Sequence, residues 1–125
     1  MTTEELKERM KRFSIRVLKM ADHLPSSYSA QVISRQITRS ASSAGANYRA
    51  VCRSKSTRDF INKLKVVEEE LDETDYWFDM IEEMEFLPAD RLKELKKEGN
   101  ELLSIVVKSL KTSKTNQRLK PGQKD

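Results

Sequence analysis

The sequence predicts an all-α protein: an antiparallel up-and-down bundle of four helices followed by a short tail. The chain has only 3 Gly and 3 Pro among 125 residues, too few for the turns of a protein with many hairpins. Charged residues make up 35% of it, with Lys, Glu, Leu and Arg in excess, which is typical of long amphipathic helices. Apolar residues recur every three or four positions along four segments separated by short turns, so successive helices should run antiparallel.

The first helix is expected to begin near Thr2, because Thr2 and Glu5 have the spacing of a capping box. Spacings of four and three keep its apolar residues on one face. These residues are Leu6, Met10, Phe13, Val17, Met20 and Leu24. Pro25 and the two serines after it end the segment and can cap the next helix.

The second helix is expected from about Ser27 to about Arg53. Its buried stripe consists of Ile33, Ile37, Ser40, Ala44, Tyr48 and Val51. Residues 40–46 in the middle of this helix are all Ser, Ala or Gly. Gly45 lowers helix stability by about 1 kcal/mol relative to Ala, which favours a neighbouring helix packed closely against it. A kink or break at this point is the alternative.

The third helix should be capped by Ser56 or Thr57 and end near Glu85. Its main stripe is Phe60, Leu64, Val67, Leu71, Thr74, Phe78 and Ile81. A second apolar group widens the apolar band to roughly half the circumference, more than one side of a small bundle needs. The extra apolar face must be covered by a second partner, either inside the bundle or on another subunit. The alternative architecture is an open array of helices that completes its core only by oligomerising. Together with two residues off the stripe of the first helix, this group forms the oligomer-interface candidates Ile15, Leu18, Val66, Trp77, Met80 and Met84.

The fourth helix should have Pro88 at its first position. Its stripe is Leu92, Leu95, Gly99, Leu102, Val106 and Leu110, flanked by Leu103 and Val107. The apolar pattern stops after Lys111. We therefore expect one domain, with a four-helix bundle over residues 1–111 and a disordered basic tail over residues 112–125.

The charge is distributed unevenly along the chain. The formal net charge is +4, from 24 basic and 20 acidic residues. Residues 25–56 carry five basic residues and no acidic one, whereas residues 57–86 carry three basic and eleven acidic residues, a balance of −8. Such asymmetry between neighbouring segments is a hint about partners.

Four arginines of the second helix form what we call the arginine ridge. At about 100° per residue they fall within a sector of about 80° opposite the apolar stripe. They are Arg35, Arg39, Arg49 and Arg53, and Lys55 follows them in the sequence. Since a guanidinium group can bind two phosphate oxygens at once, the ridge is a candidate nucleic-acid footprint.

The alternative for the ridge is ion pairing with the third helix, within or between subunits. That helix carries an acidic stripe at spacings of four and three, away from its main apolar stripe. The stripe consists of Glu68, Asp72, Asp75, Asp79 and Glu83. By itself, such a stripe is typical of a solvated face.

Catalytic chemistry has no visible machinery in this sequence. There is no Gly-rich phosphate loop and no dinucleotide fingerprint. Cys52 lacks the histidine and orienting acid that would activate a nucleophile, and His23, the only histidine, lies at a helix end. Glu70 and Glu73 have the spacing of a di-metal motif without its histidine. We expect no enzymatic activity, no cofactor and no metal.

Other features bear on the location of the protein. The first residues lack the pattern of a signal peptide, and no apolar run approaches the roughly 20 residues of a membrane span. A single cysteine fits a reducing compartment. We therefore expect a cytoplasmic protein with no membrane partner.

Residues 36–50, which read QITRSASSAGANYRA, resemble the second-helix motif of the bacterial four-helix-bundle proteins related to those encoded in 23S rRNA intervening sequences. That motif combines a Gln, a basic site, a run of small residues and an Asn. The turn and third helix agree, through Ser56, Phe60, Lys63 with Leu64, residues 68–74 (EEELDET) and Tyr76 with Trp77. The similarity spans about residues 13–110. Many members have Glu-Gly shortly after the Asn, where this chain has Tyr48-Arg49-Ala50.

The resemblance implies a cytoplasmic four-helix bundle that assembles into a ring-like homopentamer and has no known enzymatic activity. A more distant similarity is to the accessory variability protein of diversity-generating retroelements, a basic pentamer that binds a reverse transcriptase and nucleic acid. The positions that match by residue are Arg39, Asn47, Arg49 and Arg53, and their role as phosphate contacts is our hypothesis.

We therefore expect a non-enzymatic oligomer that binds nucleic acid, in particular structured RNA, through its basic surface. The alternative is a protein-interaction scaffold that recruits a partner such as a reverse transcriptase.

Overall fold

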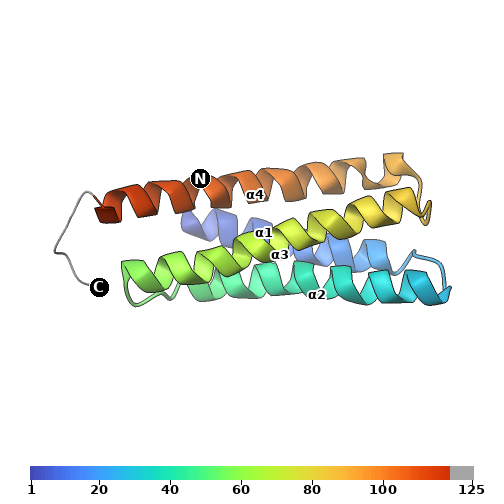
Figure 1. Ribbon diagram of the computed structural model, residues 1–125, viewed down its shortest axis with the longest axis horizontal. Coiled ribbons are helices and arrows are strands. Elements are labelled where there is room, and N and C mark those ends of the chain that lie inside the picture. Colours follow the sequence, from blue (N-terminus) through green and yellow to red (C-terminus); the bar gives the residue numbers. More distant parts are fainter. Residues whose placement is uncertain (119–125) are drawn as a thin grey trace.

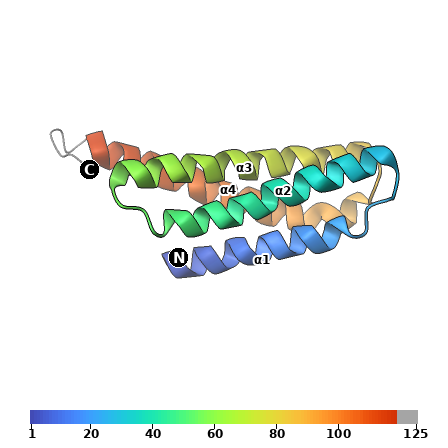
Figure 2. The same cartoon turned by 90° about the horizontal axis from the view of Figure 1, so that it is seen from below.

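Four helices form the protein in the computed structural model, which describes residues 1–118. They are α1 (Thr3–Ala21), α2 (Tyr28–Val51), α3 (Thr57–Glu83) and α4 (Ala89–Arg118). The helices lie side by side and alternate in direction along the chain (Figure 1). Each helix packs along the next one, and α4 returns to contact α1 over a narrower seam (Figure 2). The all-α, four-helix prediction is therefore confirmed for the described residues.

Local signals set the helix ends largely as the sequence indicates. The Thr2 hydroxyl accepts the backbone N–H of Glu5, and the Glu5 carboxylate accepts that of Thr2, which completes the capping box. Ser27 caps α2 and Ser56 caps α3. The α3 helix ends before Glu85, whose φ of 56° lies in the left-handed region and turns the chain toward α4.

The fourth helix differs from the prediction at both ends. It begins at Ala89, one residue after Pro88, and continues to Arg118. Residues 112–118 are therefore helical and not part of a tail that starts at residue 112. They contain no Gly or Pro, so nothing in their backbone chemistry stops the helix where the apolar stripe ends. The remainder of the expected tail, residues 119–125, lies outside the described residues.

The core follows the apolar stripes, and that of α2 is buried at all six predicted positions. On α3, Ile61 is buried where Phe60 was expected, and Phe60 packs half-buried against the same core. On α1, Ser14 and Ala21 are buried, whereas the predicted Met20 is only half-buried. Leu24, also half-buried, lies beyond the end of the helix at Ala21.

The oligomer-interface candidates divide into two groups. Trp77 and Met80 are half-buried against the core of their own chain. Part of the wide apolar band of α3 is therefore covered within the bundle and not by another subunit. The other four remain exposed, by about two fifths or more of their surface. These are Ile15, Leu18, Val66 and Met84.

Gly45 marks a close approach of α1 to α2. A Cβ atom at this position would lie 2.7 Å from the Ser14 hydroxyl oxygen, which itself lies 2.8 Å from the carbonyl oxygen of Ala41. The α2 helix runs through Gly45 without a break. Close packing, rather than a kink, is therefore the reason for the glycine.

Two contacts join α1 to α4: the packing of an aromatic ring and a cluster of ion pairs. Phe13 packs against Gly99, where an added Cβ would lie 2.9 Å from the ring. The Arg9 guanidinium binds both carboxylate oxygens of Glu98, at 2.8 and 2.7 Å, and one of Glu101, at 2.7 Å. This two-pronged contact holds the pKa of Glu98 below its ordinary value and fastens α1 to α4.

Candidate nucleic-acid interface

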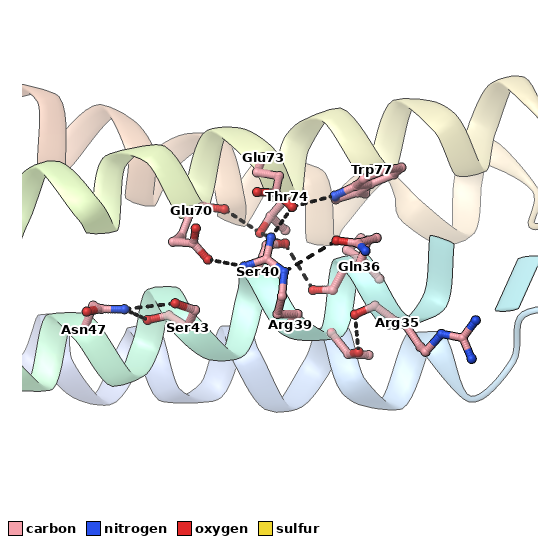
Figure 3. Close-up of polar contacts among 12 residues, drawn as sticks. Arg35, Gln36, Arg39, Ser40, Ser43, Asn47, Glu70, Glu73, Thr74 and Trp77 are labelled. Atoms are coloured by element: carbon pink, nitrogen blue, oxygen red, sulfur yellow. Dashed lines mark hydrogen bonds and ion pairs between the residues drawn. The ribbon is translucent and has the colours of Figure 1, made fainter. Parts of the chain in front are cut away.

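The arginines of the ridge do not share one environment. Arg39 crosses from α2 to α3, where its Nη1 lies 3.0 Å from the Glu70 carboxylate and its Nη2 binds Glu73 (Figure 3). It is the member of the ridge that lies nearest to the α3 side of the helical wheel. Its partners are not members of the acidic stripe. Arg39 therefore joins two helices and is not an unpaired cation.

A buried hydroxyl pair lies beside the Arg39 ion pairs. The hydroxyl oxygens of Ser40 and Thr74 lie 2.8 Å apart in the core, and the Thr74 hydroxyl also donates to the carbonyl oxygen of Glu70 at 2.8 Å. In this register Arg39, next to Ser40, lies opposite Glu73, which is next to Thr74, and opposite Glu70, one turn before Thr74. The register between helices is a tertiary property, and the spacing within each helix does not reveal it.

Glu73 is held in place by a second donor. Trp77 Nε1 donates to its carboxylate at 2.9 Å (Figure 3). This hydrogen bond and that of Arg39 hold the pKa of Glu73 below its ordinary value, so the carboxylate stays charged at neutral pH. Trp77, predicted as an interface residue, is thus bound within its own chain.

Asn47 is engaged inside α2. Its side-chain nitrogen donates to the backbone carbonyl oxygen of Ser43 at 2.8 Å and lies 2.9 Å from the Ser43 hydroxyl oxygen. The donor group that would contact a phosphate is therefore already occupied by a bond one turn back along the helix.

The other three arginines are exposed and form no ion pair with any residue of the described part of the chain. Arg49 and Arg53 lie toward α1, and the Arg35 guanidinium is directed away from Glu70 and Glu73 (Figure 3). Lys55 is also exposed, in the turn between α2 and α3, where its backbone N–H donates to Asp59 at 3.1 Å.

A groove of about 770 Å³ runs between α1 and α2. Cations contributed by α1 face those of the ridge across it, a juxtaposition that the sequence reasoning missed because periodicity does not say which helices are neighbours. Its lining consists of Glu4, Lys7, Glu8, Lys11, Ser14, Ile15, Ser42, Gly45, Ala46, Arg49, Cys52 and Arg53.

The acidic stripe makes contacts on the other side of α3. Asp79 lies 3.0 Å from Lys96 of α4, which also binds Glu82 at 2.8 Å. Burial, followed by the nearby Asp79, raises the pKa of Asp75. Within residues 1–118 no carboxylate of the stripe contacts the arginine ridge.

His23 and Cys52 are the two residues discussed above in relation to nucleophilic catalysis. His23 is exposed just after α1, and Cys52 is half-buried at the end of α2, where burial raises the pKa of its thiol. In the described part of the chain, no three His, Cys, Asp or Glu side chains are grouped as a metal site. None of its helices is long and apolar enough to cross a membrane.

Comparison with known proteins places this arrangement in a wider context. A family model described as 23S rRNA-intervening sequence protein matches residues 3–108. The crystal structure of a protein of unknown function from the S23 ribosomal protein family, from Bacteroides thetaiotaomicron, is similar with a TM-score of 0.81 and 28% identity over 89% of this chain and 99% of that chain. No curated protein matches. The matched residues include the whole ridge and groove.

Proposed function

We propose that this chain, which belongs to the 23S rRNA-intervening sequence protein family, binds nucleic acid, in particular structured RNA, through a basic surface. The observation that supports this proposal is the absence of carboxylate partners around Arg35, Arg49 and Arg53 in residues 1–118, although α3 is rich in carboxylates. Exposed guanidinium groups without such partners are suited to binding phosphate oxygens.

The charge of the whole α1–α2 half supports the same surface. Residues 1–56 carry 11 basic and 4 acidic residues, a balance of +7. The neighbouring α3 is strongly acidic and would repel a polyanion. A nucleic acid would therefore approach the α1–α2 side.

Arg39 and Asn47 are not part of the proposed contact set, although both match the family motif. Arg39 already neutralises Glu70 and Glu73, so a phosphate that bound its remaining N–H groups would also approach two carboxylates. The proposed set is Arg35, Arg49, Arg53 and Lys55.

We also propose that the chain acts as a homo-oligomer, and the family resemblance favours a pentamer. Four large apolar side chains on α1 and α3 stay exposed, which suits contacts with further copies. Light scattering at micromolar concentration tests this proposal. A stable monomer would contradict it.

The scaffold alternative requires the ridge and the acidic stripe to pair with one another across subunits. Within residues 1–118, Arg39 is the one arginine of the ridge that is ion-paired, and its partners belong to its own chain and not to the stripe. Arg35, Arg49 and Arg53 are open to phosphate oxygens and also to the acidic stripe of another copy, and the RNA titration below distinguishes the two.

Fluorescence anisotropy with labelled 23S rRNA fragments tests the RNA proposal. We expect binding at low salt that weakens steeply between about 50 and 200 mM salt, because counterions are released from the phosphates. A variant with Gln at Arg35, Arg49 and Arg53 should no longer bind the RNA at low salt. The matched control has Gln at Lys93, Lys97 and Lys108, which removes the same charge from exposed positions on α4.

Two results would refute the proposal. One is the absence of binding at low salt. The other is an equal loss of affinity in the arginine variant and in the lysine control, since that would reduce the effect to net charge.

A further inference from the structure

The groove between α1 and α2 has a cationic wall on each side. Arg49 and Arg53 come from α2, and Lys7 and Lys11 come from α1. Two carboxylates also line it. Lys7 is paired with Glu4 at 3.0 Å, and Glu8 faces Arg12, outside the lining, at 3.5 Å. This leaves Lys11, Arg49 and Arg53 without an ion pair in residues 1–118.

The register of the two helices sets Lys7 opposite Arg49, with Arg53 one turn beyond this level in one direction and Lys11 one turn beyond it in the other. Gly45 packs against Met10 and Ser14, and because the helices are antiparallel, Lys7 lies at the level of Arg49. On each wall the two cations are four residues apart, which corresponds to about 6 Å along a helix. A phosphate chain running along the groove would therefore meet cations on both sides at successive positions.

Small side chains occupy the α2 surface between the walls. They belong to Ser42, which has two side-chain heavy atoms, and Ala46, which has one. Gly45, which lies between them in the sequence, packs against Ser14 of α1. A linear chain can thus come close to the α2 backbone. A bulky ligand would stop at the rims.

We infer that this groove binds the sugar-phosphate backbone of an unpaired, single-stranded segment of nucleic acid. The inference rests on the proposed function and specifies its ligand. Proteins that bind single strands use a positively charged groove that follows the backbone, and structured RNA is recognised mostly at unpaired loops, bulges and ends.

A nucleic-acid duplex cannot enter the groove to reach the same cations. Packed helices are only about 8–10 Å apart between their axes, so a groove between two of them is too narrow to admit a double helix. A duplex resting on the α2 surface could reach Arg35, which lies on the ridge but does not line the groove. The position of Arg35 therefore separates binding in the groove from binding on the ridge.

The lining also indicates how the ligand is read. Among residues 1–118, no aromatic side chain lines the groove. Without an aromatic platform for stacking, affinity should depend on phosphates and vary little with base sequence.

Salt dependence tests the number of contacts. For single strands the logarithm of affinity falls with the logarithm of salt concentration with a slope of about −0.7 per phosphate contact, so three contacts give about −2. Between about 50 and 200 mM salt, the full-length chain should lose about 20-fold in affinity for a single-stranded 12-mer RNA. Over the same salt range the variant Arg49→Gln/Arg53→Gln should lose only about 3-fold in affinity, because two of the three contacts are gone. The matched control Lys93→Gln/Lys97→Gln, at exposed positions on α4, should lose about 20-fold like the unmodified chain.

A second variant fills the groove without changing its charge. Ala46→Leu, which keeps helix propensity close to that of Ala, should weaken binding of the 12-mer by about tenfold or more. The matched control is Ser104→Leu, at an exposed position on α4. Circular dichroism checks that each variant is folded. If Ala46→Leu fails to fold, the arginine variants, which change only exposed residues, still test the inference.

The same measurements are made with a duplex RNA of the same sequence and with poly-L-glutamate as competitor. Tighter binding of the single strand, weakened by both groove variants more than by Arg35→Gln, supports the inference. Equal or tighter binding of the duplex, or an effect of Arg35→Gln as large as that of Arg49→Gln/Arg53→Gln, overturns it and leaves the proposed function standing. Competition by poly-L-glutamate as strong as by the RNA also overturns it, in favour of an acidic protein. If neither RNA binds at low salt, the proposed function itself fails.

Discussion

Replacing Gly45 by Ala should have opposite effects on stability depending on one hydroxyl group. A Cβ at position 45 would lie 2.7 Å from Ser14 Oγ, but 3.8 Å from Ser14 Cβ and 3.6 Å from the Met10 carbonyl oxygen. Only the first of these distances is a clash. Ser14 Oγ cannot easily move away, because it is buried and hydrogen-bonded to the carbonyl oxygens of Ala41 and Met10.

The expected magnitudes follow from these contacts. In the unmodified chain, Gly45→Ala gains about 1 kcal/mol of helix propensity. It loses the Ser14 hydrogen bond, about 1 kcal/mol, and adds about 1 kcal/mol of overpacking strain. The net change is a destabilisation of about 1 kcal/mol. In a Ser14→Ala background the clash is absent, so the same substitution should stabilise by about 1 kcal/mol.

Urea unfolding of the four variants, followed by far-UV circular dichroism at one fixed protein concentration, measures this cycle. A coupling energy of about 2 kcal/mol between positions 14 and 45 is expected. An equal effect of Gly45→Ala in both backgrounds would refute the conclusion that the glycine is required by the Ser14 hydroxyl. Fixing the concentration matters because assembly would add to the apparent stability.

Other substitutions test the α1–α4 seam and the Arg39 network. Gly99→Ala places a Cβ 2.9 Å from the buried Phe13 ring, so thermal unfolding should show a loss of about 1–2 kcal/mol instead of the gain that Ala gives in an open helix. Phe13→Ala should lower the free energy of unfolding by about 3–5 kcal/mol, because it leaves a cavity in the core. A loss below about 1 kcal/mol would contradict the burial of Phe13. The pKa of Glu73 is lowered in the folded state, so its contribution to stability is present above the pKa of the unfolded chain and is lost as pH falls through the folded value. The urea midpoint should therefore drop more between about pH 5 and pH 3 in the unmodified chain than in Glu73→Gln, and the fluorescence of Trp77, the only tryptophan, should change over the same range. Identical pH profiles for the two proteins would show that this carboxylate is not held as described.

Helix ends and core faces could be read from single segments because their causes are local. The capping box at Thr2 involves residues three apart, and the stripe of α2 depends only on the pitch of the helix. The end of α4 was misplaced for an equally local reason. A missing apolar stripe removes tertiary contacts, but it does not stop a helix that lacks Gly and Pro.

The candidate site could be predicted only in part. The exposure of Arg35, Arg49 and Arg53 follows from their position opposite the core face. The pairing of Arg39 with Glu70 and Glu73 does not, because it depends on the register of α2 against α3, in which Ser40 also meets Thr74. Ion pairs form between whichever residues that register brings within reach.

The sequence by itself determined that the chain forms four amphipathic helices and that positive and negative charge are concentrated on successive segments. It favoured a packing role for Gly45 but left a kink there open. These properties follow from spacing along one helix and from residue chemistry. Only the tertiary structure decided which arginine is neutralised and that Lys7 and Lys11 face Arg49 and Arg53 across one groove. Those outcomes depend on which helices are neighbours and on their relative register, and core packing between distant segments fixes both.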